Sequence, residues 1–132
     1  MKEKILFVNS CVRGDNESRT LALAKTALSR LDGNIEEIRL ADANLKPLDA
    51  AGLAKRAESA EKNDFSDPVY DCAKQFAACD TVVIAAPFWD YSFPAFLKIY
   101  IESLCVGGLT FLYGSDGVPI SYCRAKKLIY IT

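Results

Sequence analysis

The fold is decided by the stretch KILFVN at residues 4–9, in which four large apolar side chains follow one another without a polar break. A strand with one face in solvent alternates apolar and polar residues, whereas a strand buried on both faces carries a continuous apolar run. The stretches TVVIA at 81–85 and LIYI at 128–131 repeat the continuous pattern. The sequence therefore predicts buried strands of a parallel sheet covered by helices on both faces.

The intervening segments predict the order of the strands. Residues 18–31 predict a helix with one apolar stripe, and Gly33 just beyond is expected to end it. This stripe consists of Leu21, Ala24, Leu28 and Leu31. Residues 35–40 predict a second strand whose charges suit a sheet edge. The result is an α/β three-layer sandwich with parallel sheet order 2-1-3-4, whose usual fifth strand is missing, so we expect a chain that is incomplete at its C-terminus.

Three further helices are predicted on the remaining chain. Residues 41–64 are expected to form a loop and a polar, alanine-rich helix without an assigned function. Asp67 and Pro68 suit the first positions of the next helix, and Pro94 suits those of the last. Inward-facing side chains are expected at Val69, Cys72, Ala73, Phe76, Leu97, Ile101 and Leu104.

Composition limits the class of protein. The 132 residues allow one domain, 1–132, and with 51% apolar residues and a net charge of -1 they offer no basic stripe for nucleic acid. Apolar runs are too short for a membrane span, and the first is too short for a signal peptide, so a cytoplasmic location is expected.

Cysteine and histidine usage bears on the chemistry. The five cysteines have no CxxC spacing, which argues against a disulfide framework or a zinc site and favours small core residues. Histidine, the commonest general base and metal ligand, is absent. We therefore expect no metal and no catalytic side chain, with the chemistry carried by a bound group.

The loop at residues 9–17 is a candidate phosphate site. Ligands of such a sheet bind where the winding reverses, here at the carboxyl ends of the first and third strands. The loop leads into a helix N-terminus, where free amides and the helix dipole favour an anion. Ser10 and Ser18 supply hydroxyls, Asn16 an amide and Arg19 a charge. The alternative is a polar loop that only caps the helix.

The loop PFWDYSF at residues 87–93 follows the third strand and carries four aromatic side chains. Such rings could stack on a flat heterocycle. The alternative is that they pack on the domain itself or on a second subunit. The two loops together favour a ligand with a phosphate at one end and a flat ring at the other.

On these residues the chain resembles the FMN-dependent NADH:quinone oxidoreductase and azoreductase family of flavodoxin-like quinone reductases. The most distinctive stretches are IAAPFWDY at 84–91, Leu97-Lys98 and GLTFLY at 108–113, and the 10–18 loop has the family's length. The resemblance implies that FMN phosphate and ribityl chain contact Ser10, Asn16, Glu17 and Ser18. It implies that the flavin ring lies against Pro87, Phe88, Trp89, Asp90 and Tyr91. It further implies a substrate pocket, shared across a homodimer, that includes Gly108, Phe111 and Tyr113.

Three positions depart from the family pattern. Asn16 replaces a hydroxyl residue, Glu17 places a carboxylate beside the phosphate, and Asp90 stands where asparagine is common. A carboxylate at Glu17 suits a phosphate site only if its side chain points outward and its N–H inward. The family's third flavin loop would begin where this sequence ends.

The resemblance implies a reaction in which hydride passes from NADH or NADPH through FMN to a quinone, an azo compound or a similar flat acceptor. One alternative is a non-catalytic electron carrier of the flavodoxin type, although flavodoxins are usually strongly acidic. Another is a truncated member without flavin. The sequence does not distinguish among acceptors or between the two nicotinamide cofactors.

Overall fold

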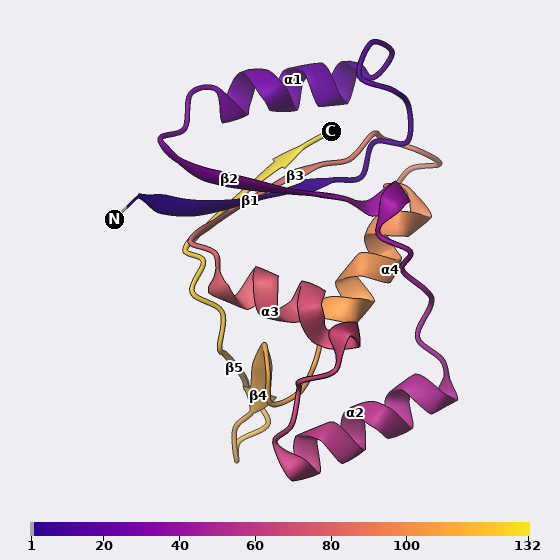
Figure 1. The fold of residues 1–132 in the computed structure, drawn as a ribbon, viewed down its shortest axis with the longest axis vertical. Helices are drawn as coiled ribbons and strands as arrows, with labels where there is room; N and C mark the ends of the chain where they lie inside the picture. Colours follow the sequence, from indigo (N-terminus) through magenta and orange to yellow (C-terminus); the bar gives the residue numbers. More distant parts are fainter. Residues whose placement is uncertain (1) are drawn as a thin grey trace.

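Four parallel strands form the central sheet of the computed structural model, which describes residues 2–132 (Figure 1). These strands are β1 (Glu3–Asn9), β2 (Gly33–Arg39), β3 (Thr81–Ala85) and β6 (Lys127–Ile131). Their order is β2-β1-β3-β6, with β2 at one edge. This confirms the predicted order 2-1-3-4, because the predicted fourth strand is β6.

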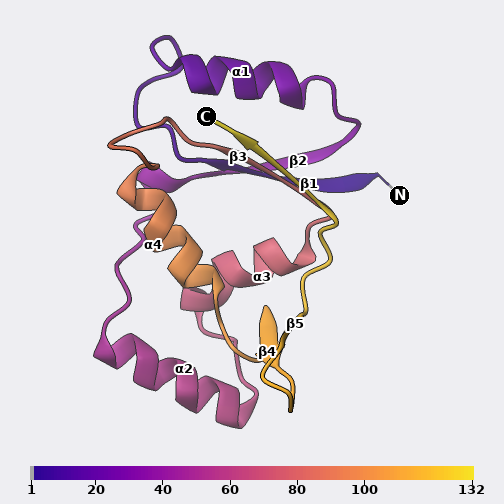
Figure 2. The ribbon, with the colours of Figure 1, turned by 180° about the vertical axis from the view of Figure 1, so that it is seen from behind.

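Helices cover both faces of the sheet, as Figures 1 and 2 show. The helix α1 (Arg19–Leu28) lies on one face, while α3 (Asp71–Ala78) and α4 (Ala95–Leu104) lie on the other. Ile5 and Phe7 pack with the α1 side, and Leu6 and Val8 pack with the α4 side. The continuous apolar run of β1 therefore supplies two cores at once.

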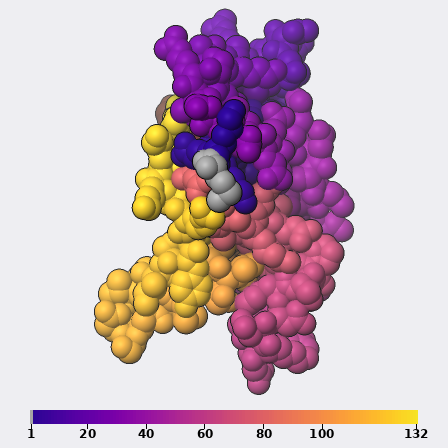
Figure 3. Space-filling model, turned by 60° about the vertical axis from the view of Figure 1, so that its left-hand side comes forward, coloured from indigo at the N-terminus to yellow at the C-terminus, as the bar shows by residue number. Residues whose placement is uncertain are grey.

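Two connections between strands of the sheet run on the α4 side, one from β2 to β3 and one from β3 to β6. After β2 comes the 3₁₀ helix η1 (Leu40–Asp42), and then α2 (Ala50–Lys62), which has no buried residue and lies at the far end of the molecule (Figure 1). The hairpin of β4 (Phe111–Tyr113) and β5 (Pro119–Ser121) forms a separate antiparallel sheet. Figure 3 shows this hairpin projecting from the lower end of the molecule.

Two local predictions were wrong. The helix α1 ends at Leu28, and Gly33 instead begins β2, where a Cβ would lie 2.6 Å from the Glu3 carbonyl oxygen. Asp67 caps a 3₁₀ helix, η2 (Pro68–Tyr70), before α3 begins. Because a 3₁₀ turn has three residues rather than 3.6, Tyr70 occupies the inward position and Val69 is 58% exposed. Glycine at 33 thus permits close strand pairing rather than helix termination.

Burial also differs from expectation in the last strand and among the cysteines. Leu128 and Tyr130 are about half exposed, because β6 pairs only with β3 and so stands at a sheet edge. Cys11 and Cys79 are buried as expected, whereas Cys105 is exposed. Among the described residues, no helix is long and apolar enough to cross a membrane.

Candidate functional site

The two predicted ligand loops meet at the carboxyl ends of β1 and β3. The Ser10 amide donates to the Ala85 carbonyl oxygen at 2.9 Å, which joins the starts of the two loops. Between the loops lies a groove of about 340 Å³. Its lining residues are Val12, Arg13, Glu17, Ser18, Arg19, Thr20, Pro87 and Trp89. The two loops singled out from the sequence therefore border one groove.

The first loop is held in a tight conformation by its own polar groups. The Cys11 amide donates to Asn9 Oδ1 at 2.9 Å, and the Leu21 amide donates to Ser18 Oγ at 3.1 Å. The amides of Glu17 and Ser18 both donate to the Gly14 carbonyl oxygen, at 3.0 and 3.2 Å. Glu17 is exposed and lines the groove, and its N–H is used inside the loop, whereas a phosphate site would require the carboxylate outside and the N–H free.

The backbone amides without a partner belong to the two residues that follow Ser18. Among the described residues, neither the Arg19 nor the Thr20 amide has a hydrogen-bond partner. Both belong to the first turn of α1, which exposes unpaired N–H groups and the positive end of the helix dipole. Since both residues line the groove, this turn offers an anion two N–H donors.

Ser10 carries a buried hydroxyl that nothing in residues 2–132 satisfies. The side chain is 2% exposed and its Oγ has no hydrogen-bond partner. A buried polar group left unpaired costs on the order of 1–3 kcal/mol. A buried polar group without a partner calls for an explanation, and a bound ligand is one. Ser10 is therefore a candidate ligand contact on structural grounds as well as by position.

Charge in and beside the groove favours an anion. Arg13 and Arg19 line it against the single carboxylate of Glu17. The nearby Asp15 carboxylate pairs with Lys25 at 3.1 Å and with Arg39 at 3.7 Å, which neutralises it. Beneath the loop, burial raises the pKa of the Cys11 thiol, so this group stays protonated at neutral pH. Arg13 and Thr20 also line the groove but were not predicted as ligand contacts. Their positions beside the start of the helix could have indicated them.

The second loop presents aromatic rings on a tight turn. Trp89 and Ser92 exchange two backbone hydrogen bonds of 3.0 and 2.8 Å. The two residues between them, Asp90 and Tyr91, have φ of 49° and 61°, a left-handed conformation that costs non-glycine residues roughly 1–2 kcal/mol each. Backbone strain of this kind concentrates at functional sites.

The aromatic side chains of this loop divide into two groups. Phe88 is 65% exposed and Tyr91 is 93% exposed, with their rings edge to face at 6.2 Å. Trp89 faces the groove, whereas Phe93 packs against the core. The alternative that these rings pack on their own domain therefore holds for Phe93 only.

The predicted substrate-pocket residues lie elsewhere in the chain. Gly108, Phe111 and Tyr113 belong to the hairpin end, near α2 and α3 and far from the groove (Figures 1 and 2). Gly108 has φ of 89° and its N–H donates to the Phe111 carbonyl oxygen at 2.8 Å. A single chain thus does not bring these residues to the two loops.

Residues 3–132 match the family model described as the flavodoxin-like fold. An FMN-dependent NADH:quinone oxidoreductase of Clostridium perfringens is 32% identical over 133 residues, which cover 97% of this chain and 67% of that protein. The chain belongs to the flavodoxin-like family that includes these oxidoreductases. A second such protein, from Clostridium acetobutylicum, is 35% identical over 143 residues, covering 97% of this chain and 66% of the relative.

Solved structures of this family share the fold. The azoreductase of Bacillus anthracis superposes with a TM-score of 0.69 at 25% identity, covering 89% of this chain and 62% of its own. An FMN-dependent NADH-azoreductase of the same species, in complex with FMN, gives a TM-score of 0.73 at 21% identity, covering 97% and 68%. The chain thus spans about two thirds of the length of the relatives it matches.

Proposed function

We propose that this chain binds FMN in the groove between its two loops and belongs to an oxidoreductase that uses NADH or NADPH to reduce quinones, azo compounds or similar flat acceptors. The observation that carries the proposal is the shared groove of about 340 Å³, whose lining joins the first turn of α1 to Trp89 of the second loop. FMN has the matching shape, a phosphate at one end and a flat ring at the other. The names of the relatives support the same cofactor and acceptors.

The residues of the first loop would hold the phosphate and ribityl chain. The Ser18 hydroxyl already accepts the Leu21 amide, so its hydrogen remains free to donate to a phosphate oxygen. The Arg19 and Thr20 amides and the Arg13 guanidinium add donors on the same side. Ser10, Asn16 and Glu17 complete the proposed contact set, with Ser10 gaining the partner that it lacks.

The residues of the second loop would hold the flavin ring. Pro87 and Trp89 line the groove directly, and Phe88, Asp90 and Tyr91 belong to the same rigid turn. When bound, FMN supplies the two-electron chemistry between nicotinamide and acceptor. The protein side chains contribute orientation, by stacking flat molecules in a fixed place, and no histidine is available for proton transfer.

We infer that the working form is a cytoplasmic homodimer in which the hairpin of one subunit approaches the groove of the other. The hairpin presents Leu112, Tyr113, Val118 and Ile120, each about half exposed or more. Large exposed apolar patches on soluble proteins mark association surfaces. In this arrangement Gly108, Phe111 and Tyr113 would line the partner's substrate pocket.

FMN titration of the purified chain, followed by quenching of flavin fluorescence, tests the proposal. Trp89→Ala is expected to weaken FMN binding by roughly 10-fold, since stacking on an aromatic ring is worth about 1–3 kcal/mol. Tyr122→Ala, which removes a similarly exposed aromatic ring away from the groove, should leave FMN binding unchanged.

The activity assay adds NADH and a soluble quinone to the FMN-loaded chain. Oxidation of NADH that depends on FMN supports an enzyme, whereas bound FMN without NADH oxidation supports the electron-carrier alternative. A chain that does not bind FMN at all contradicts both.

A further inference from the structure

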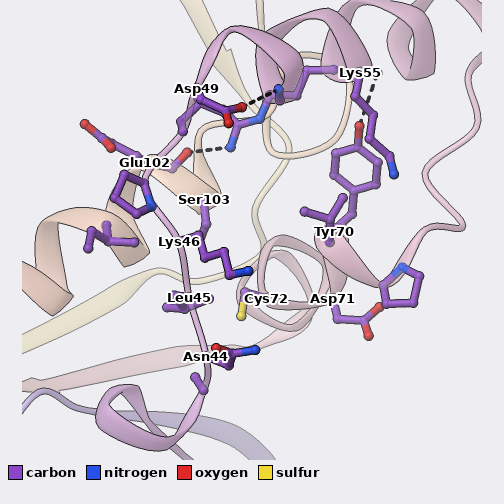
Figure 4. Close-up of a pocket in the computed structure, with 18 of the residues that line it drawn as sticks. Asn44, Leu45, Lys46, Asp49, Lys55, Tyr70, Asp71, Cys72, Glu102 and Ser103 are labelled. Carbon is purple, nitrogen blue, oxygen red and sulfur yellow. Dashed lines mark hydrogen bonds between the residues drawn. The ribbon is translucent and has the colours of Figure 1, made fainter.

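A second and larger cavity lies on the α4 side of the sheet, away from the groove. It has a volume of about 600 Å³ and shares no lining residue with the groove. Its walls come from the segment 43–49, the start of α2, the η2–α3 junction and the end of α4 (Figure 4). Small-molecule sites in proteins typically have volumes of 300–1,000 Å³. The cavity is therefore large enough for a ligand of its own.

Most of the cavity wall is apolar. Three segments distant in sequence contribute large apolar side chains, which would surround the body of a ligand. They are Ile38, Leu45, Pro47, Leu48, Tyr70 and Ile99. Tyr70 is fixed in place because its hydroxyl donates to Ser59 Oγ at 2.8 Å. The wall is thus both apolar and held by polar contacts behind it.

Several charged groups around the cavity already have partners. Asp49 Oδ1 accepts the Gly52 amide at 2.8 Å and caps α2, and Lys55 pairs with Asp67. Arg56 donates to the carbonyl oxygens of Glu102 and Cys105 at 2.8 and 3.1 Å, at the end of α4. These groups hold the walls together and are not free for a ligand.

Lys46 differs from these groups. Lys46 is exposed, and within residues 2–132 its ammonium takes part in no ion pair or hydrogen bond. Figure 4 shows the side chain extending from its segment into the cavity, toward Cys72. The Asp71 carboxylate faces Lys74 at 3.8 Å, and the Glu102 carboxylate points away from the labelled cavity residues. Lys46 is therefore the lining cation that has no partner within residues 2–132, beside a wall that is mostly apolar.

We propose that this cavity is a second ligand site that binds a small organic anion, with an apolar body and a single carboxylate or sulfonate group. Lys46 binds the anionic group, and the apolar wall covers the body. The Lys46 ammonium, which has no partner within residues 2–132, supplies the charge opposite to that of the ligand. The cavity volume and its apolar lining accommodate the ligand's apolar body. This site is independent of the proposed flavin groove.

Anilinonaphthalene sulfonate is a suitable probe because it joins an apolar aromatic body to one sulfonate. The FMN-loaded chain is titrated with the probe by isothermal calorimetry, and the contacted amides are located by ¹H–¹⁵N NMR. We expect saturable binding of one probe per chain, with shifts at Leu45, Lys46 and Tyr70. Lys46→Ala should weaken binding by about 5-fold, the equivalent of an exposed charge pair of about 1 kcal/mol, and Lys46→Arg should restore it.

Matched variants separate this site from other apolar surfaces. Lys127→Ala removes a lysine from β6, on another part of the molecule, and should leave binding unchanged. Val69→Trp introduces bulk at an exposed position of the cavity rim and should reduce binding of the probe and of its uncharged analogue, phenylnaphthylamine. Lys46→Ala should not affect the uncharged analogue.

Four results would overturn the proposal. They are unchanged binding in Lys46→Ala, competition between the probe and FMN, NMR shifts confined to the hairpin, and binding that weakens as protein concentration rises. The last result would mean that a second copy of the chain covers the cavity.

Discussion

At the residue scale, the hydroxyls of Ser10 and Tyr100 are both buried without a hydrogen-bond partner among the described residues, but for different reasons. Tyr100, a residue of α4, is fully buried among apolar side chains, and its hydroxyl has no partner within residues 2–132. Burial raises the pKa of the Tyr100 phenol far above its ordinary value, so it remains neutral. Tyr100 lines neither the groove between the two loops nor the larger cavity at Lys46. Its unpaired hydroxyl therefore only lowers the stability of the fold. The Ser10 hydroxyl, in contrast, lies at the start of a proposed ligand loop.

Replacing Tyr100 with phenylalanine should raise the free energy of unfolding by up to about 1 kcal/mol, because it removes an unpaired polar group and leaves the ring. Urea denaturation measures the change. Tyr70→Phe is the matched control, since that hydroxyl is bonded to Ser59, and it should lower stability by about 1 kcal/mol. Equal destabilisation by both variants would contradict this account of Tyr100.

Ser10→Ala should separate stability from ligand binding. Without FMN the variant is expected to be as stable as the original chain or slightly more stable, because no hydrogen bond is lost. FMN affinity should fall by roughly 5- to 10-fold, the loss of about one hydrogen bond to a charged group. Calorimetric titration measures the affinity. Unchanged FMN affinity would remove Ser10 from the site.

At the element scale, the sequence pattern was reliable where burial alone determines the structure. The continuous apolar runs of β1 and β3 could be predicted because both faces of these central strands meet helices. The orientation of Val69 could not, since a 3₁₀ turn and an α-helical turn share the same capping signals at Asp67 and Pro68. The exposure of β6 depends on what lies beside it, which its own residues do not encode.

The candidate site shows the same limit. The positions of both loops follow from sheet order, so the sequence could place them at one edge. The internal hydrogen bonds from Glu17 and Ser18 to Gly14 depend on the loop conformation, and no residue pattern indicates them. The cavity at Lys46 arises between elements distant in sequence, and it was not predicted for the same reason.

Asp80 links three elements at the amino end of the sheet and should make stability depend on pH. Its carboxylate accepts the Lys4 amide and the Arg124 guanidinium, each at 2.9 Å. The Lys4 amide, followed by the positive charges of Arg124 and Lys4, lowers the pKa of Asp80 below its ordinary 3.8. A lowered pKa in the folded state stabilises the fold above pH 3.8, and this contribution is lost as the pH falls through the folded-state value.

Asp80→Asn should therefore lower the urea midpoint at pH 7, and the difference from the original chain should shrink as the pH falls below 3.8. Urea denaturation at several pH values measures this. Asp32→Asn, at an exposed carboxylate, controls for the change in net charge. A difference that stayed constant down to low pH would show that the Asp80 charge does not stabilise the fold.

At the scale of the whole molecule, α1, whose first turn lines the groove, and the β4–β5 hairpin lie at opposite ends of the chain (Figure 1). The proposed dimer would unite them, because each groove would meet the hairpin of the partner. The chain covers 62% of the Bacillus anthracis azoreductase, and the test of the dimer uses a preparation for which FMN-dependent NADH oxidation has first been measured.

Mixing two impaired variants, at an FMN concentration that does not saturate Trp89→Ala, tests the shared pocket directly. Trp89→Ala is impaired in the groove and Tyr113→Ala in the hairpin, so each alone should have low activity. If subunits exchange freely, half of the dimers are mixed, and each mixed dimer has one groove and one facing hairpin that are both intact. NADH oxidation should then recover to about a quarter of the original rate. If each site were built within one chain, the mixture would show only the average of the two low activities. This result would contradict the shared pocket even if sedimentation showed a dimer.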